Sequence, residues 1–325
     1  QAKMVLAIIG SLEQIIEQYQ LNLLQLIFII FIVTIVLLGS LMTLMEPYLP
    51  NSIRQSFRYG KHSHKGATDA LVNHLEVPKA WFSHFYVFAF GWSLLSLYFI
   101  IRSVISQELA PEFVLRFLDL ICGGQQRQVQ VDSNTALLAS LLLGLQCVRR
   151  FYETNFVQIF SKRSKINLSH YVVGYVHYFG AITSLLSNTA GFVRGSKPTP
   201  FTLSNLSLLQ LGYILVFLFA WHQQYSSNMV LVNLRKNAKT GAVQTEEHLL
   251  PSRGWFNLIS SPHMFFEVVM YYCLADLMTP IRTWKLIFVW VASNQTINAL
   301  LTHQWYKENF KDYPKRRHAI IPWLL

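Results

Sequence analysis

A run without any charged residue, from position 21 to position 45, places the strongest constraint on how this chain can fold. A transmembrane helix needs about 20 apolar residues, so the run is long enough to cross a bilayer and too long for a signal-peptide core. The chain as a whole agrees, because its 325 residues are 52% hydrophobic and only 13% charged. An average soluble domain is about 25% charged. We therefore expect an integral membrane protein.

Six more apolar segments follow the first one along the chain. The predicted spans are roughly 21–45, 80–105, 134–155, 168–193, 202–224, 262–281 and 284–303. They indicate an all-α fold with seven transmembrane helices, in a single membrane-embedded domain that covers residues 1–325.

The basic residues orient these spans. With the C-terminus in the cytosol, the segments 46–79, 149–167, 225–261 and 304–325 share one side and carry 19 of the 27 Lys and Arg residues. Cytosolic flanks of membrane helices are enriched in these residues, so the N-terminus is expected in the lumen. Because these cations face anionic headgroups, the formal charge of +11 gives no reason to expect a nucleic-acid partner.

Polar and ionisable side chains interrupt the apolar spans in the last third of the chain. Such groups are expensive near a bilayer, so their density indicates a functional site. The candidates are Gln224, Asn228, Asn233, Arg235, His248, His263, Glu267, His303 and Tyr306. A guanidinium binds phosphate bidentately, and amides hydrogen bond to ribose hydroxyls or a carboxamide. The set therefore suits a phosphorylated ligand.

Simpler interpretations of the same residues stay open at this stage. Arg235 and Lys236 can anchor to headgroups, because residues 234–241 have the basic last turn and the Asn and Gly that end a helix. An intramembrane histidine can hydrogen bond to a neighbouring helix. The pair His62 and His64 has no carboxylate or cysteine near it in sequence, so no metal site is expected.

A dinucleotide would have to be bound without a Rossmann turn, because the chain has no Gly-x-Gly-x-x-Gly motif. It also lacks a P-loop, a Gly-x-Ser-x-Gly motif and a His-Glu-x-x-His motif. Any nucleotide site must therefore form between the helices.

Residues 70–325 resemble the steroid 5α-reductase family, most closely its polyprenol (polyprenal) reductase branch. The resemblance rests on Glu76-Val-Pro-Lys-Ala-Trp81-Phe, on Arg149-Arg150 with Glu153, and on the segments 212–237 and 251–267. The ending His303-Gln-Trp-Tyr306-Lys, followed by Tyr313-Pro-Lys-x-Arg317 and Ile321-Pro-Trp, is the most specific part.

The resemblance implies a seven-helix fold that binds NADPH between its helices, mainly through residues 202–325, and reduces a double bond conjugated to a carbonyl. It also implies that the polar series listed above contacts this cofactor. The chain has Asn298 and Thr302 where steroid-reducing members have Arg and His, so we expect His303 to contact the cofactor in their place.

On the substrate side, Glu76 matches the acid that faces the substrate carbonyl in this family. The preceding Gln is replaced by Leu75, and the tyrosine that partners this acid would align near Cys147. Candidate replacements are Tyr152, Tyr171 and His170, and Arg150 and Trp81 are expected to contact substrate. The aromatic segment that starts at Trp81 can instead form a belt at the membrane interface.

The reaction that the resemblance implies needs an electron sink. Hydride addition to the β-carbon of an enal places negative charge on the carbonyl oxygen, which Glu76 would stabilise by donating a hydrogen bond. A free allylic alcohol has no such sink, so we expect polyprenal, drawn from the bilayer, as the immediate substrate. The family implies dolichol synthesis in the endoplasmic reticulum membrane, and no obligate protein partner is evident.

Two alternatives differ in their testable consequences. Within the family, the substrate can be a 3-oxo-Δ4-steroid or a trans-2-enoyl-CoA, although the missing Gln and Tyr disfavour a steroid. Outside it, a seven-helix receptor has the same topology but would not bind NADPH.

Overall fold

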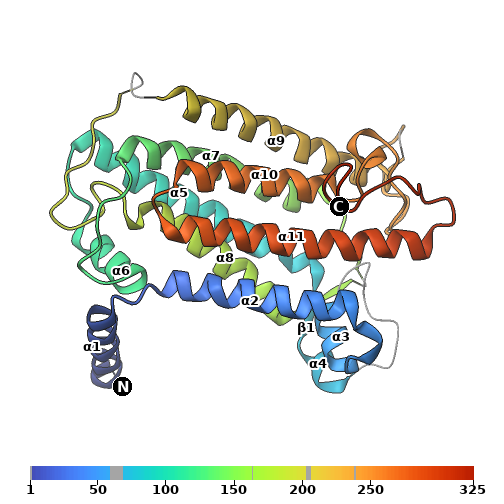
Figure 1. Cartoon of the computed structure of the whole chain (residues 1–325), viewed down its shortest axis with the longest axis horizontal. Helices are drawn as coiled ribbons and strands as arrows, with labels where there is room; N and C mark the ends of the chain where they lie inside the picture. The colour runs from blue at the N-terminus through green and yellow to red at the C-terminus, as the bar shows by residue number, and fades with distance from the viewer. Residues whose placement is uncertain (1, 59–68, 163, 203–205, 238) are drawn as a thin grey trace.

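The computed structural model describes residues 2–58, 69–162, 164–202, 206–237 and 239–325. His62 and His64 lie outside the described residues. Within that described part, seven helices lie side by side and form a bundle (Figure 1). They are α2 (Leu23–Leu44), α5 (Phe82–Ser106), α7 (Ser133–Tyr152), α8 (Leu168–Ser187), α9 (Leu208–Asn233), α10 (Pro262–Leu277) and α11 (Arg282–Asn309).

Each of the seven predicted spans corresponds to one of these helices. Two segments, Leu23–Leu44 and Lys79–Ser106, are long and apolar enough to cross a membrane by length and composition. The described residues are mostly helical, and these two segments are candidate membrane spans.

Shorter elements flank the bundle. The helices among them are α1 (Ala2–Tyr19), α3 (Asn51–Phe57), α4 (Ala70–His74) and α6 (Glu112–Cys122). Short 3-10 turns cover Glu46–Tyr48, Lys79–Trp81 and Gly254–Asn257, and a π-helical turn at Glu153–Val157 continues α7. Strands β1 (Glu76–Pro78) and β2 (Lys165–Asn167) pair antiparallel, with Glu76 opposite Asn167. None of these flanking elements was predicted, because the prediction rested on long apolar runs.

Polar side chains fix where several helices begin. Asn22 accepts a hydrogen bond from the Gln25 amide at 3.0 Å, and Asp132 and Asn167 cap α7 and α8 in the same way. Ser207 and Gln210 form a reciprocal capping box at the start of α9. These caps satisfy amides that a helix leaves without an intrahelical partner. They place the start of α9 at residue 208 instead of the predicted 202.

Two helix ends also differ from the predicted span boundaries. Helix α9 continues to Asn233, nine residues past position 224, and its polar residues Ser227 and Asn228 in this extension are buried against protein. It ends just before the stop predicted at residues 234–241, so Arg235 and Lys236 follow the helix and do not form its last turn. Helix α8 ends at Ser187 instead of 193, and the chain turns through Gly191, whose φ of +87° favours glycine.

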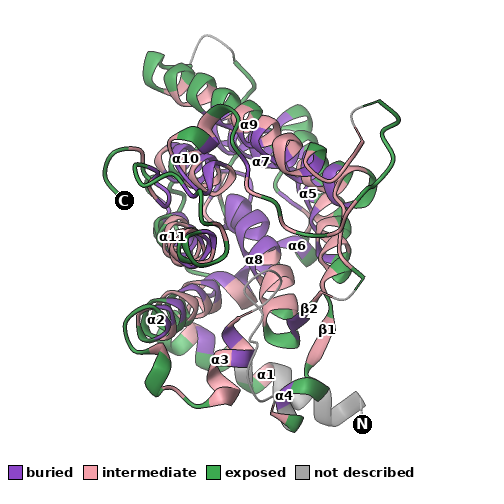
Figure 2. Ribbon diagram, turned by 90° about the vertical axis from the view of Figure 1, so that its right-hand side faces the viewer, coloured by how far each residue is buried: buried purple, intermediate pink, exposed green. Residues whose placement is uncertain are grey.

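The bundle is closed by contacts between neighbouring helices. Helix α9 packs against α10, α10 against α11, and α11 against α2, while α5 packs against α7 and α8. Figure 2 shows α8 near the centre with a largely buried surface, and its residues from His177 to Ser187 are buried except for the half-buried Phe179. Phe28, Phe217 and Trp284 are fully buried in the shared apolar core.

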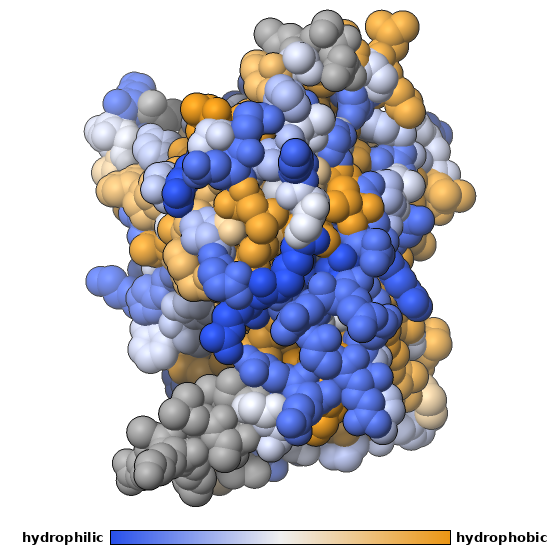
Figure 3. All heavy atoms as spheres, turned by 90° about the vertical axis from the view of Figure 1, so that its left-hand side faces the viewer, coloured by the Kyte–Doolittle hydropathy of each residue, from blue (hydrophilic) through white to orange (hydrophobic). Residues whose placement is uncertain are grey.

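The end of the bundle near α1 and α6 is hydrophilic (Figure 3). Arg127 is 7% exposed and donates to Asp119 through Nε at 3.0 Å and Nη2 at 2.6 Å. Arg194 donates to the other oxygen of Asp119 at 2.8 Å and bidentately to Glu112. This ion network joins α6 to the loop after α8, and it lies at the opposite end from the cavity described next.

Candidate functional site

A cavity of about 360 Å³ opens between the ends of α5, α7, α9, α10 and α11, at the end of the bundle near the C-terminus in Figure 1. Six of the nine predicted cofactor-binding residues line it, together with one predicted substrate-binding residue. They are Asn228, Arg235, His248, His263, Glu267, Tyr306 and Arg150. These residues are up to 156 positions apart in the chain, so the fold brings them together.

Helix spacing explains why several of these residues share the cavity. His263 and Glu267 are one turn apart on α10, as the sequence predicted, and both line it. Phe82 and Tyr86 repeat this four-residue spacing at the start of α5. Lys79, in the turn just before α5, completes the same wall.

The cavity is positively charged. Among the described lining residues, Glu267 is the one acid, against the three cations Lys79, Arg150 and Arg235. Arg235 donates to the carbonyl oxygen of Ile159 at 2.8 Å and to that of Glu247 at 3.0 Å. Burial lowers the pKa of Arg235, which means that desolvation disfavours its charge. A bound anion would offset that cost.

The other three predicted cofactor residues are absent from the described lining. Gln224 lies behind the cavity wall, 2% exposed, where its Nε2 donates to Glu267 Oε2 and to the His263 carbonyl oxygen, both at 3.0 Å. Asn233 is exposed at the end of α9. Gln224 therefore acts on the cavity through Glu267 and His263.

His303 corrects a prediction. We expected His303 to contact the cofactor in place of residues 298 and 302, but the structure shows the reverse arrangement. Asn298 and Thr302 line the cavity. The ring of His303 faces away, with Nδ1 2.8 Å from Ser260 Oγ and 2.7 Å from the Tyr313 hydroxyl. The reason is helical geometry, because adjacent positions 302 and 303 point about 100° apart.

The bonds of His303 belong to the anchor of the C-terminal tail. Ser260 Oγ also lies 2.5 Å from the Tyr313 hydroxyl, and it donates to the His318 carbonyl oxygen at 3.0 Å. The Tyr313 ring stacks on Tyr306, with centroids 5.9 Å apart. The tail therefore supports the cavity wall from behind through Tyr306.

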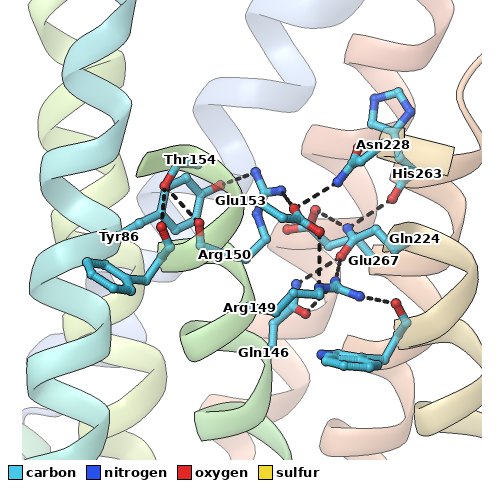
Figure 4. A network of polar contacts seen from close by, with 12 residues as sticks. Tyr86, Gln146, Arg149, Arg150, Glu153, Thr154, Gln224, Asn228, His263 and Glu267 are labelled. Carbon is cyan, nitrogen blue, oxygen red and sulfur yellow. Dashed lines mark hydrogen bonds and ion pairs between the residues drawn. The ribbon is translucent and has the colours of Figure 1, made fainter. Parts of the chain in front are cut away.

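Behind the cavity lies a buried polar network (Figure 4), which adds Gln146, Arg149 and Glu153 to the predicted residues Arg150, Gln224, Asn228 and Glu267. Arg149 donates to Gln146 Oε1 at 2.6 Å, and also to Gln224 Oε1 and the Trp221 carbonyl oxygen. Gln146 donates to Gln224 at 3.0 Å. The network thus connects α7 to α9, and Gln224 carries the connection on to Glu267 of α10.

Glu153 holds the second half of this network. It is 1% exposed, forms an ion pair with Arg150, and has Oε1 3.4 Å from Arg149 Nε. Asn228 donates to its Oε2 at 3.0 Å. Arg150 also donates to the Tyr86 hydroxyl at 3.0 Å, with its guanidinium 4.7 Å from the centroid of that ring. Two cations are therefore balanced by Glu153 and Glu267.

A sequence signal for this network exists. Arg149 and Glu153 are four positions apart and Arg150 and Glu153 three, inside an otherwise apolar span. Ionisable residues at membrane depth mark a site by default, and this spacing puts them on one face. Lys79 and Tyr86 carried no such signal, because a lysine before a span and an aromatic residue in it are ordinary.

Apart from Arg150, the predicted substrate and catalytic residues lie outside the described cavity lining. Glu76, in β1, accepts a hydrogen bond from Gln55 at 3.2 Å and has Oε2 3.6 Å from Lys165 Nζ. Tyr171 lies 3.2 Å from His84 Nδ1 and 3.0 Å from the Tyr175 hydroxyl, and its ring packs against Trp81.

The two remaining candidates have different surroundings. His170 packs against Phe57, with centroids 6.4 Å apart. Tyr152 is 52% exposed beside Phe156, so its hydroxyl is not enclosed by the bundle. Among the described residues, no group of three or more His, Cys, Asp or Glu side chains is arranged to hold a metal ion.

The chain is similar to several known proteins. Residues 166–325 match the family described as 3-oxo-5-alpha-steroid 4-dehydrogenase. A Drosophila melanogaster protein named polyprenal reductase is 65% identical over 98% of this chain and 98% of its own length. Proteins of the same name from Caenorhabditis elegans and Homo sapiens are 34% and 30% identical, over 87% of this chain and 91% and 92% of their own lengths.

Proposed function

Since the chain belongs to the steroid 5α-reductase family, among the relatives named polyprenal reductase, we propose that it reduces the α-isoprene double bond of polyprenal with NADPH. The observation that carries this proposal is the positively charged cavity between the helix ends, which gathers Arg150, Arg235 and Glu267. A receptor is excluded by the family, whose members are oxidoreductases.

The chemistry of the cavity's donor set fits NADPH. Lys79 and Arg235, from segments outside the bundle helices, supply the cations that the phosphates require, and His248 also lines the cavity. Asn228, His263, Glu267 and Tyr306 would contact the rest of the cofactor, and Gln224 would position Glu267. Bound NADPH supplies the hydride.

Reduction of the substrate requires a hydrogen-bond donor near its carbonyl oxygen. When the β-carbon of an enal is reduced, negative charge develops on that oxygen, and donors fixed in place beforehand stabilise it. Glu76 is the family's candidate for this role. In the structure it accepts a hydrogen bond from Gln55 and has Oε2 3.6 Å from Lys165 Nζ. The Glu76→Gln variant tests it.

The lipid tail is expected to remain in the bilayer and reach the cavity between helices. Trp81 and Tyr171 pack together near the start of α5, with ring centroids 5.6 Å apart and Trp81 39% exposed. We propose that this aromatic pair contacts the polyisoprenoid chain, with His170 beside it.

The proposal includes a topology. The seven bundle helices cross the membrane of the endoplasmic reticulum, with the N-terminus in the lumen and the C-terminus in the cytosol. The cavity and 19 of the 27 Lys and Arg residues then lie on the cytosolic side, where NADPH is available. Residues 202–325 contribute most of the cofactor contacts, and no obligate protein partner is required.

The test is a panel of acceptors. Detergent-purified protein is given NADPH with polyprenal, polyprenol, a 3-oxo-Δ4-steroid or a trans-2-enoyl-CoA in parallel. We expect NADPH oxidation with polyprenal. Oxidation only with the steroid or the thioester would replace the substrate class, and oxidation with none of the four would overturn the proposed function.

A further inference from the structure

The cavity has two chemically different ends. Lys79, Arg235 and His248 belong to segments outside the bundle helices and form the cationic mouth. Tyr86, Arg150 and Glu267 lie within α5, α7 and α10 and form the inner end. If the phosphates of a dinucleotide occupy the mouth, its reactive ring and the acceptor that it reduces must meet at the inner end.

The hydrogen bonds of Tyr86 leave its own proton available. Arg150 has only donors, so the 3.0 Å contact must use the phenol oxygen of Tyr86 as acceptor. Tyr178 is a further hydrogen-bond partner of this hydroxyl. The phenol oxygen has two lone pairs and can accept from both partners. The O–H of Tyr86 can then donate to a group in the cavity.

The surroundings hold Arg150 in this position. Its other terminal nitrogen is paired with Glu153, which is buried and also accepts from Asn228 at 3.0 Å. Its guanidinium lies 4.7 Å from the Tyr86 ring centroid. A donor fixed by a cation in a closed site stabilises developing negative charge without reorganising.

The other groups at the inner end suit this role less well. Glu267 has an acidic side chain whose Oε2 already accepts a hydrogen bond from Gln224 Nε2. Arg150 and Asn228 already donate to Glu153. Glu76 lies outside the described lining of the cavity, beside Gln55 and Lys165.

We infer that Tyr86, held by Arg150, is the catalytic residue that donates a hydrogen bond to the substrate's carbonyl oxygen. This inference rests on the proposed function, because it takes the acceptor to be an enal. Tyr86 would supply the hydroxyl that is missing at Cys147, from a different helix. Its role is to stabilise the charge that develops on oxygen, and no proton transfer is assigned to it.

The test compares Tyr86→Phe with a matched control, Tyr98→Phe, on the same helix. Tyr98 is 58% exposed and outside the cavity lining. We expect Tyr86→Phe to lower kcat for polyprenal roughly 100-fold, the usual effect of losing one oxyanion donor. The Kd for NADPH, followed by fluorescence, should stay within about twofold of wild type, because Tyr86 is not assigned to the cofactor. Tyr98→Phe should leave both the kcat for polyprenal and the Kd for NADPH equal to those of wild type.

A binding measurement tests the same contact without turnover. Polyprenoic acid places a carboxylate where the aldehyde oxygen would lie, whereas polyprenol places a neutral hydroxyl there. Tyr86→Phe should weaken the acid about 10- to 100-fold, as expected for a hydrogen bond to a charged group, and polyprenol much less.

Each failure has its own signature. Equal affinity of Tyr86→Phe and wild type for the acid would overturn the inference, and so would a parallel loss of NADPH affinity, which would make Tyr86 a cofactor contact. A wild-type protein that binds the acid through Tyr86 but does not reduce polyprenal would instead overturn the proposed function.

Discussion

Gln224 of α9 donates a hydrogen bond from Nε2 to Oε2 of Glu267 of α10, at 3.0 Å. The same amide accepts from Gln146 and Arg149 of α7 through its oxygen. One buried side chain therefore sets the position of the only acid in the described cavity lining and joins three helices. This arrangement makes Gln224 a positioning residue for the cavity.

Replacing Gln224 with Ala should weaken cofactor binding without abolishing the fold. Loss of a buried hydrogen bond that orients Glu267 is expected to raise the Kd for NADPH about tenfold, the equivalent of about 1.4 kcal/mol. His222→Ala, at an exposed position of the same helix, is the control. Unchanged NADPH affinity in Gln224→Ala would mean that Glu267 does not contact the cofactor.

Arg235→Ala should reduce NADPH affinity and its dependence on salt together. A hydrogen bond to a charged group contributes about 1.5–3 kcal/mol, so the Kd should rise roughly 10- to 100-fold at low ionic strength. Arg235 also donates hydrogen bonds to the carbonyl oxygens of Ile159 and Glu247. A change in affinity alone therefore does not show whether the lost charge or a displaced loop is the cause. A flatter slope of log Kd against log salt does, and Lys236→Ala, at a residue absent from the described cavity lining, should keep the wild-type slope.

Glu153→Ala should be among the most destabilising single substitutions in the bundle. It would leave Arg149 and Arg150 buried without their shared carboxylate, a change that typically costs 3–5 kcal/mol. The measurement is the thermal unfolding midpoint in detergent. Glu308→Ala, at an exposed position of α11, should leave the midpoint close to wild type, and a similarly small shift for Glu153→Ala would contradict the role of the network.

The end of the bundle near α6 should lose stability in acid. Hydrogen bonds from Arg194 lower the pKa of Glu112 below its usual 4.5. A carboxyl with a lowered folded-state pKa contributes stability above its unfolded pKa and loses it as the pH falls through the folded value. Wild type should therefore exceed Glu112→Gln in unfolding midpoint near pH 7, with the difference shrinking below about pH 4.5. A difference that grows in acid would have the wrong sign.

The sequence predicted the helical part of the fold well, for a physical reason. A helix in a bilayer must satisfy its own backbone hydrogen bonds, so a long apolar run leaves few alternatives. Each of the seven predicted segments is a helix in the structure. The ends were less certain, because α9 runs on through residues 225–233, whose polar members Ser227 and Asn228 are buried against protein.

The site was predicted in part, and the misses follow from geometry. Arg235, His263 and Glu267 line the cavity as expected. The choice between Thr302 and His303 depended on helical phase, which a single residue of misalignment reverses. Tyr86 was missed because its role depends on Arg150, 64 positions away, and composition does not reveal such a pairing.

The central claim is tested most directly by giving purified wild-type protein NADPH with either polyprenal or polyprenol of the same chain length. The products are followed by mass spectrometry. The account predicts that the aldehyde gains two hydrogens and that the alcohol is recovered unchanged, because only the aldehyde offers an oxygen on which charge can develop. Reduction of the free alcohol, in protein without alcohol-oxidising activity, would contradict it.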